Sequence, residues 1–393
     1  MRPALHAVLA LFLLNGALFG SWAARIPAFK ERFALSPDAL GVLLLCLAGG
    51  AILAFPAAGR IIDRQGPELL SKILAVAYCL ALPALAAAPD PIWLAVTLLV
   101  FGACFGAMDV AMNAWGAEVE TARGKPLLPQ LHAVFSLGAG LGAAGGGLAV
   151  AAGLGPLGHF TLVALALGIL TVPFALRAPA SPRPPAAADV GAPAARGPVL
   201  PTGALLLVGL IAGGTGLSEA AVADWSAVYL RVVTEAPPSI AALGFAAFST
   251  TMVIVRLSGG WIVERLGAVQ ATRLSGLCLA LGTGIVVLAT ASLPTLGGFA
   301  VMGCGAALVM PLAFARAAAD PRVAPGTAIA QVALIGYGGL LLGPPLIGFI
   351  AARSDYPTAF LLLLALGLLV ALLAPALRAP LEADRENHEV TEE

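Results

Sequence analysis

Residues 59–66 read Gly59-Arg-Ile-Ile-Asp63-Arg64-Gln-Gly66, a short polar segment between two long apolar runs. The same spacing of glycine, acid, arginine and glycine returns as Gly260-Trp-Ile-Val-Glu264-Arg265-Leu-Gly267. One copy falls in each half of a chain of 393 residues. This recurrence indicates a duplicated protein with a matching loop in each half.

Two further pairs of segments agree with a duplication. Ser21-Trp22-Ala23 resembles Asp224-Trp225-Ser226, and Leu40-Gly41 resembles Leu243-Gly244. Each pair is separated by nearly the same number of residues as the two polar motifs. The sequence therefore predicts two parallel structural repeats.

The composition is that of a membrane protein. Hydrophobic residues make up 60% of the chain and charged residues 11%, with a mean hydropathy of +0.97. A soluble domain carries about 25% charged residues, so lipid is the expected solvent. The net charge is zero, which gives no electrostatic basis for binding nucleic acid. The five cysteines lie in apolar runs without ligand spacing, so we expect neither a disulfide framework nor a metal site.

Runs long enough to cross a bilayer, which takes roughly 20 apolar residues, occur twelve times. They are 4–25, 38–60, 68–88, 91–117, 129–152, 156–177, 202–230, 238–262, 270–290, 293–315, 326–352 and 356–377. Backbone groups in lipid must bond within their own segment, which predicts helices. We expect an all-α membrane protein, with the first run retained as a transmembrane helix and not removed as a signal peptide.

The runs divide into two groups of six. We expect an N-terminal six-helix bundle over 1–177 and a C-terminal six-helix bundle over 201–378. Residues 178–200 are rich in proline and alanine and have the composition of a flexible linker. Residues 379–393 form an acidic tail.

Lysine and arginine accumulate on the cytoplasmic side of membrane proteins. If both termini are cytoplasmic, that side carries Arg2, Arg60, Arg64, Lys72, Arg123, Lys125, Arg177, Arg183, Arg196, Arg265, Arg273, Arg316, Arg322, Arg378 and Arg385. The other side then keeps Arg25, Lys30, Arg32, Arg231 and Arg353. This bias predicts cytoplasmic termini, a cytoplasmic linker and a multi-pass protein of the bacterial cytoplasmic (inner) membrane.

With twelve helices, a central linker and a G-x-x-x-D-R-x-G loop after the second helix, the chain resembles the major facilitator superfamily over nearly its whole length. Within it, three stretches are similar to the fucose permease group and its uncharacterised bacterial relatives. They are Asp109 followed four residues later by Asn113, Trp225-Ser226, and Val255-Arg256-Leu-Ser-Gly-Gly-Trp261. Fucose permeases carry an aspartate late in the first helix, where this chain has Ala23.

The resemblance implies a secondary transporter whose two halves rock about a central site near the bilayer midplane. It implies that the first, fourth, seventh and tenth helices face that site. We expect a monomer that binds a small-molecule solute and protons in a lipid bilayer. The proton gradient supplies the energy, and no cofactor is needed. The sequence contains no P-loop and no nucleophile–base arrangement, so we do not expect an enzyme.

Ionisable groups within apolar helices are costly to insert and therefore indicate function. Asp109 lies near the middle of the run 91–117, with Asn113 one turn further on the same face. A carboxyl group shielded from water binds its proton more tightly than one in water. Asp109 is thus a candidate proton carrier and acceptor for solute hydroxyls, or else a structural acid paired with a neighbouring helix. His132, at the start of the run 129–152, is a second candidate for proton coupling, because the adjacent fourth and fifth helices would let it approach Asp109 or Asn113. Its alternative role is that of an ordinary interfacial histidine.

The seventh run carries two acids. Glu219 is nearer mid-membrane and is the better coupling candidate. Asp224 adjoins Trp225, whose ring can stack on a sugar, although Asp224 is equally a gate residue facing Arg231 or Arg25.

Other polar side chains also lie within the apolar runs. Arg256 either binds a carboxylate of an organic anion or pairs with Glu264 or with an acid from another helix. Asn15, Gln331 and Tyr337 are uncharged candidates for lining the site, or for bonding between packed helices.

The two polar motifs are predicted to act as a latch at the cytoplasmic gate. Asp63 would face the helix start near Pro325-Gly326, and Glu264 the helix start near Pro129, where the helix dipole favours an acid. The gate residues are Gly59, Asp63, Arg64, Gly66, Gly260, Glu264, Arg265 and Gly267, with Arg123 and Arg316 as further partners.

These observations predict proton-coupled symport of a small polar solute such as a sugar. Export of an amphipathic metabolite or drug, transport of an organic anion through Arg256, and a non-transporting receptor or scaffold are the alternatives.

Overall fold

The computed structural model describes residues 2–123, 127–178, 201, 203–323 and 325–378. The predicted linker (apart from Ala178) and the acidic tail lie outside these residues, as do the side chains of Asp63 and of 325–327. In the described part of the chain every regular element is a helix, and twelve segments are long and apolar enough to cross a membrane. The predicted all-α class is confirmed.

The first half holds seven helices. They are α1 (Arg2–Ala23), α2 (Ile26–Arg32), α3 (Pro37–Gln65), α4 (Pro67–Ala87), α5 (Pro91–Arg123), α6 (Leu128–Ala151) and α7 (Pro156–Arg177). Most of them begin at or beside a proline, whose fixed φ and missing N–H suit the first helical position. The short α2 prolongs the first predicted run, so that its span reaches Arg32.

The second half begins with α8 (Gly203–Val233), α9 (Pro238–Ala241), α10 (Leu243–Leu257) and α11 (Gly259–Leu288). It continues with α12 (Ser292–Ala306), α13 (Val309–Ala318), α14 (Pro325–Arg353), α15 (Tyr356–Leu373) and the 3-10 turn η1 (Ala374–Leu377). The run predicted as a single helix over 293–315 is broken between Ala306 and Val309. The break lies beside the candidate site described below.

The final glycines of the two polar motifs have the same backbone conformation. Gly66 has φ 86° and ψ 155°, and Gly267 has φ 73° and ψ 162°. This region is open to glycine and strained for other residues. Gly66 separates α3 from α4, and Gly267 makes a sharp kink inside α11. The predicted repeat is therefore present in the backbone itself.

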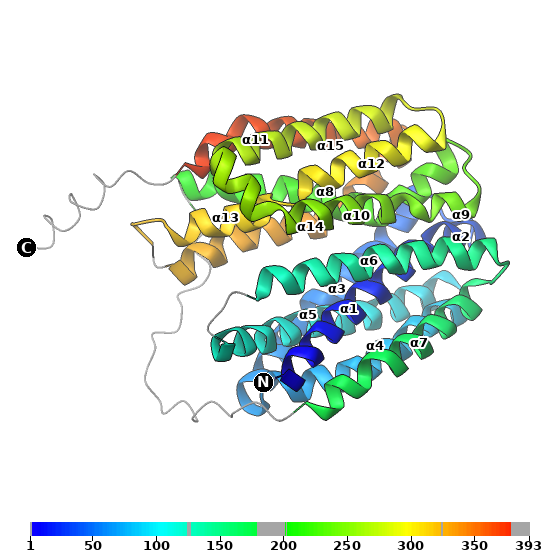
Figure 1. The fold of residues 1–393 in the computed structure, drawn as a ribbon. Coiled ribbons are helices and arrows are strands. Elements are labelled where there is room, and N and C mark those ends of the chain that lie inside the picture. The colour runs from blue at the N-terminus through cyan, green and yellow to red at the C-terminus, as the bar shows by residue number, and fades with distance from the viewer. Residues whose placement is uncertain (1, 124–126, 179–200, 202, 324, 379–393) are drawn as a thin grey trace, which may run out of the picture.

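The helices form two bundles, one before and one after the predicted linker (Figure 1). Along the boundary between them α3 packs on α14, and α6 packs on α10. We call the end that holds α2 and α9 the α2 end, and the opposite end, which holds Gly66 and Gly267, the motif end. The bundles lie against each other at the α2 end and diverge toward the motif end (Figure 1).

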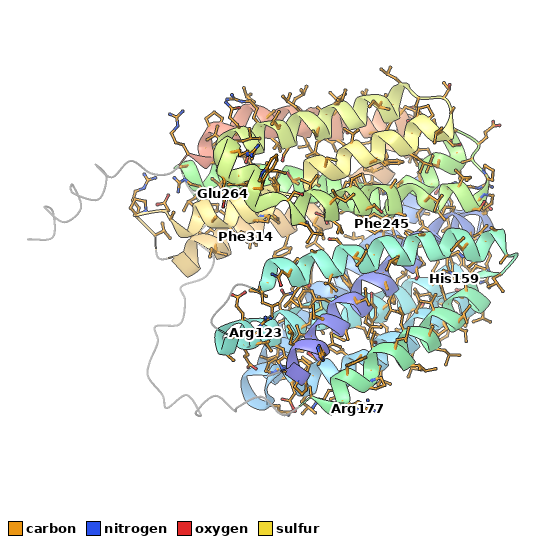
Figure 2. All side chains as sticks on the ribbon, viewed as in Figure 1. Arg123, His159, Arg177, Phe245, Glu264 and Phe314 are labelled. Atoms are coloured by element: carbon orange, nitrogen blue, oxygen red, sulfur yellow. The ribbon has the colours of Figure 1, made fainter. Side chains whose placement is uncertain are left out.

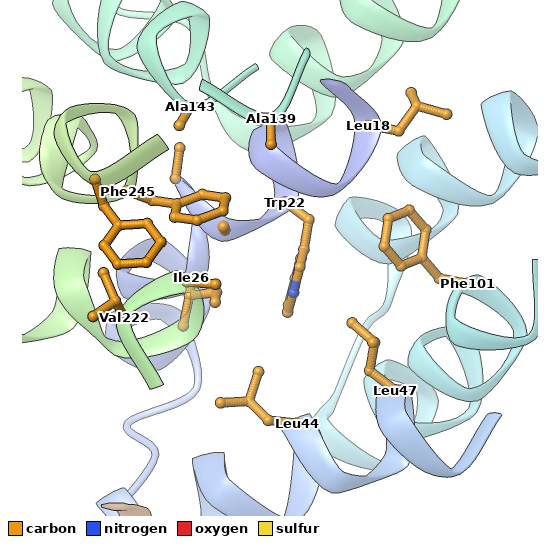
Figure 3. Packing of buried hydrophobic residues seen from close by; sticks show 14 of the residues in the cluster. Leu18, Trp22, Ile26, Leu44, Leu47, Phe101, Ala139, Ala143, Val222 and Phe245 are labelled. Atoms are coloured by element: carbon orange, nitrogen blue, oxygen red, sulfur yellow. The ribbon is translucent and has the colours of Figure 1, made fainter. Parts of the chain in front are cut away.

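A buried apolar core supports the α2 end. Trp22 is surrounded by Leu18, Leu47 and Phe101, while Ile26 lies between it and Val222 of the second half (Figure 3). Tight packing here comes from glycine, because a Cβ on Gly348 would meet the carbonyl oxygen of Pro37. These contacts hold the two halves together at the α2 end.

Candidate functional site

Asp109 and Asn113 form one hydrogen-bonded pair in α5. Asn113 Nδ2 donates to Asp109 Oδ1 at 3.2 Å and to the Asp109 carbonyl at 2.8 Å. Both side chains are partly buried. The spacing of four residues predicted a shared face, and the structure confirms that the two residues meet. The amide positions the carboxyl group and leaves its second oxygen, Oδ2, for a proton or a solute.

Tyr337 of α14 brings the acids of the two halves together. Its hydroxyl interacts electrostatically with Asp109 of the first half and with Glu219 of the second half. The Tyr337 side chain is 47% exposed and Glu219 is partly buried. Tyr337 therefore lies within electrostatic range of one acid from each half.

Arg256 of α10 lies at the boundary between the bundles, on the side of the second half. Glu219 acts electrostatically on its guanidinium group. Arg256 Nη1 donates to Ser136 Oγ of α6 at 2.6 Å, and Nε donates to the carbonyl of Ala307 at 3.2 Å. The Ala307 carbonyl is available because α12 ends just before it. Arg256 thus bonds to the opposite half, and not to Glu264 as one of our expectations held.

His132 lies one turn before Ser136 and is exposed. Its ring meets Phe12 edge to face, with centroids 5.6 Å apart, and its imidazole lies within electrostatic range of Arg256. We had expected it to approach Asp109 or Asn113. The structure places it instead within electrostatic range of Arg256.

The Trp225 side chain packs in the interior of the protein. It is fully buried, its Nε1 donates to the Pro344 carbonyl at 3.0 Å, and its ring packs on Tyr356. A ring enclosed in this way is not available to stack on a sugar in this conformation. Asp224 is also buried, with Oδ1 lacking a hydrogen-bond partner among the described residues.

Two of the uncharged candidates are shielded from the region between the bundles. Asn15 is fully buried, and its Nδ2 contacts Met112 Sδ at 3.7 Å. Gln331 is 9% exposed. In this conformation these side chains fit helix packing better than solute binding.

The ion pair that joins the halves at the α2 end was not predicted. Arg231 Nη2 lies 2.7 Å from Glu31 Oε1, and Arg231 Nε donates to the same oxygen at 2.9 Å. We had offered Asp224 as the partner of Arg231 or Arg25. Arg25 instead donates to His159 Nδ1 and to the carbonyl of Leu154 within the first half.

Glu264, one of the two acids of the predicted latch, is exposed in this structure (Figure 2). The neighbouring Arg265 lies over the Trp261 ring, 4.4 Å from its centroid. The side chain of Asp63, the other acid of the latch, lies outside the described residues. The start of α6 is satisfied by Glu120, whose Oε2 accepts from the backbone N–H groups of Leu127 and Leu128. The expected contact of Glu264 with α6 is therefore replaced by an acid from α5.

The remaining gate residues also lie apart from one another. Arg316 is buried and pairs with Asp320 one turn further along, at 3.3 Å. Arg64 and Arg123 are exposed. Because the motif end is open, these positions do not test whether the latch forms when that end closes.

Over the described residues there is no group of three histidine, cysteine or acidic side chains that could hold a metal ion. The five cysteines, all within these residues, are free thiols. The polar groups between the bundles are two carboxyls, one guanidinium, one imidazole, one amide and two hydroxyls. Such a set offers both donors and acceptors of hydrogen bonds to a polar solute.

Comparison with known proteins decides the family. The Major Facilitator Superfamily model matches residues 8–323. This chain belongs to the major facilitator superfamily. It is 42% identical to an uncharacterized transporter of Sinorhizobium fredii, over 95% of this chain and 98% of that protein. It is 32% identical to the membrane protein MosC of Rhizobium meliloti, over 93% and 88% of the two chains.

Solved structures of superfamily members share the fold. The nucleoside transporter NupG superposes with a TM-score of 0.76 at 14% identity, covering 95% of this chain and 99% of NupG. A D-xylose–proton symporter superposes with a TM-score of 0.71 at 16% identity, covering 96% and 98%. This member of the superfamily is accordingly a multi-pass transporter and not an enzyme.

Proposed function

We propose that this superfamily member carries a small neutral polar solute, of the sugar or polyol class, together with a proton. The observation that carries the proposal is that Asp109 and Glu219, from opposite halves, both lie within electrostatic range of the Tyr337 hydroxyl. A solute between the halves would contact both acids at once. Its binding would then be linked to the relative position of the two bundles.

The two acids suit a neutral solute. Carboxylates accept hydrogen bonds from solute hydroxyls, while Arg256, Tyr337 and Asn113 offer donors. An anionic solute would meet two carboxyl groups against a single guanidinium that already bonds to Ser136 and Ala307. The solved relatives named above include a xylose–proton symporter and a nucleoside transporter, whose substrates both contain a sugar.

Proton coupling follows from the cost of enclosing charge. Burying an unpaired carboxylate is expensive, whereas its neutral form is accommodated by hydrogen bonds. When both ends of the transporter are closed, an unpaired carboxylate at Asp109 or Glu219 would be costly. Passage through this closed state is therefore easier when each of the two acids either carries a proton or is paired with a partner group. A proton taken up with the solute from one side and released on the other would couple the two fluxes, with the proton gradient as energy source.

We further propose that the protein resides in the bacterial cytoplasmic membrane with the motif end in the cytoplasm. The bias of lysine and arginine toward that end supports this orientation. In that case the structure is open toward the cytoplasm. The alternating-access cycle then closes the motif end and opens the α2 end, with 178–200 as the linker between two bundles that work as a monomer.

The proposal is tested with purified protein in two steps. A thermal-shift panel of pentoses, hexoses, polyols, nucleosides and organic acids identifies the solute class, because a ligand stabilises the folded state in proportion to ln(1 + [L]/Kd). Uptake of the stabilising compound into proteoliposomes is then measured with and without an inward proton gradient. We expect gradient-dependent accumulation that a protonophore abolishes; equal uptake under both conditions would contradict the proposal.

A further inference from the structure

An apolar groove lies on the first bundle, between α3, α4 and α5 near the motif end. It has a volume of about 280 Å³ and is lined by alanine, leucine, isoleucine, valine and cysteine side chains. Ala57 of α3 and Val100 of α5, which belong to this lining, are exposed. Because these helices span the bilayer, the groove opens to the acyl chains of the surrounding lipid.

Glycines of α5 explain where the groove begins. A Cβ on Gly102 would meet the Leu47 carbonyl oxygen, and a Cβ on Gly106 would meet Ala51, so α3 and α5 touch backbone to backbone there. The lining of the groove starts on α3 at Ala54, directly after this contact. Toward the motif end, Leu70 and Leu74 of α4 form the opposite wall.

The groove and the candidate solute site lie on opposite faces of α5. Ala103 and Ala107 line the groove, whereas Asp109 and Asn113 form the hydrogen-bonded pair described above. With 3.6 residues per turn, these two pairs of positions point in nearly opposite directions from the helix axis. The groove is therefore separate from the site at which we place the solute.

A second hollow continues the groove toward the motif end. Ala57 and Ile61 line both hollows, and Arg60, Arg64 and Gln65 line the second one. Both arginines are exposed, and they lie one turn apart on the same face of α3. Among the described residues that line the two hollows, none is acidic. The membrane span of α3 ends between the two arginines, so the apolar groove leads to a pair of cations at the membrane surface.

The second polar motif has a different arrangement at the corresponding positions. Trp261 stands in the place of Arg60, and Arg265 in the place of Arg64. The Arg265 guanidinium lies over the Trp261 ring, 4.4 Å from its centroid. The first motif has two cations one turn apart instead, and like charges at this spacing repel each other. An anion bound between Arg60 and Arg64 would remove that repulsion.

We propose that this groove binds one anionic glycerophospholipid, with its phosphate on Arg60 and Arg64 and an acyl chain along α3, α4 and α5. Guanidinium groups form charge-assisted, often bidentate hydrogen bonds with phosphate oxygens. Basic residues at the membrane surface attract anionic lipids, and the bilayer supplies this ligand at high concentration. The apolar groove next to the cations selects a lipid over a free phosphate ion. A lipid bound here would pack against α5 on the face opposite Asp109.

The headgroup is tested with the purified full-length protein by native mass spectrometry. The protein is titrated with dioleoylphosphatidylglycerol and with dioleoylphosphatidylcholine, which has the same chains on a zwitterionic headgroup. Glycerol 3-phosphate, which has the charge without the chains, is the third probe. The double variant Arg60→Gln with Arg64→Gln removes both cations. Arg177→Gln, at an exposed position of α7 outside the two hollows, is the matched control for loss of charge.

We expect the parent to bind phosphatidylglycerol at least about tenfold more tightly than phosphatidylcholine, because each arginine near an anionic headgroup contributes about fivefold. The double variant should bind both lipids equally, and Arg177→Gln should keep the preference. Glycerol 3-phosphate should not bind at concentrations that saturate the protein with phosphatidylglycerol. A parent without preference, a double variant that keeps it, an Arg177→Gln protein that loses it, or glycerol 3-phosphate binding as tight as that of the lipid would each overturn the inference.

The position of the acyl chain is tested with Ala57→Phe, which fills the groove at an exposed residue. Leu53→Phe, at an exposed position of α3 outside the groove, is the matched control. Losing contact with even one methylene weakens binding about fourfold, so Ala57→Phe should lower the affinity for both lipids by at least about fourfold and keep the headgroup preference. Unchanged affinity for both lipids, with a parental thermal midpoint, would overturn the inference. These experiments measure no transport, so their outcome is independent of the proposed solute and proton coupling.

Discussion

Glu31 and Arg231 tie the two halves together at the α2 end: Arg231 Nη2 lies 2.7 Å from Glu31 Oε1, and Arg231 Nη1 donates to the Ala236 carbonyl. The two residues come from α2 of the first half and α8 of the second half. The same pair must separate when the α2 end opens. It therefore acts as a closure that favours the conformation in this structure.

Breaking this closure should shift the protein toward the conformation that is open at the α2 end. Exposed ion pairs contribute about 0.2–1 kcal/mol, which corresponds to about a 1.4- to 5-fold change in the ratio of conformers. Glu31→Gln should show this change as faster cysteine labelling at the α2 end. Lys30→Gln, next to it, is the control, and the double exchange Glu31→Arg with Arg231→Glu should restore the parent ratio. Unchanged labelling in Glu31→Gln would show that the pair does not contribute.

The final motif glycines should be far less tolerant of alanine than the first ones. Gly66→Ala and Gly267→Ala place a Cβ in a backbone region that costs of order 1–3 kcal/mol for non-glycine residues. Gly59 and Gly260 have no atom within 4 Å of an added Cβ and serve as matched controls. We expect lower thermal midpoints only for the two substitutions at positive φ. Equal midpoints for all four variants would contradict the assigned turns.

Trp225 should influence stability more than solute affinity. Trp225→Phe removes the bond to the Pro344 carbonyl, which typically costs about 0.5–1.5 kcal/mol, while the ring stays in its pocket. We expect a lower thermal midpoint and a solute KM within about twofold of the parent value. A large rise in KM with unchanged stability would instead place Trp225 at the solute, as its neighbour Asp224 first suggested.

Asp355, an acid outside the membrane spans, should make the thermal stability of the protein depend on pH. The Thr358 N–H donates to Asp355 Oδ1 at 2.7 Å, and this backbone bond, with help from the Thr358 side chain, holds the pKa of Asp355 below its ordinary value. A depressed folded-state pKa gives stabilisation that is present above the unfolded-state pKa and lost as the pH falls through the folded-state value. Asp355→Ala should therefore lower the thermal midpoint at pH 7 and converge with the parent below about pH 3.

Asp355→Asn is the control for this experiment, because asparagine also caps a helix but does not titrate. Its midpoint should remain close to that of the parent at pH 7. A difference between Asp355→Ala and the parent that persists unchanged in acid would show that the charge of Asp355 does not stabilise α15.

The sequence predicted the architecture well because the bilayer imposes simple rules. Apolar runs of sufficient length marked the twelve spans, and the motif pair revealed the repeat that Gly66 and Gly267 confirm in the backbone. Asp109 and Asn113 meet because four residues make one helical turn. These features depend on spacing along one segment, which a sequence displays directly.

Features that join distant segments were harder to predict. The bond between Arg256 and Ser136 depends on how α6 crosses α10, and on the Ala307 carbonyl that the break between α12 and α13 leaves free. Trp225 was placed at the solute because it adjoins an acid, yet adjacent residues in a helix point in different directions. The Glu31–Arg231 pair likewise joins distant segments, α2 of the first half and α8 of the second half.

We propose that Asp109 couples solute movement to protons. Two assays on Asp109→Asn in the same proteoliposomes decide this: solute exchange without a gradient, and accumulation driven by an inward proton gradient. Glu235→Gln, at an exposed acid next to the α2 end, is the control. We expect Asp109→Asn to retain exchange while its accumulation falls to the level measured without a gradient. Gradient-driven accumulation by Asp109→Asn equal to that of the parent would exclude the proposed role of Asp109.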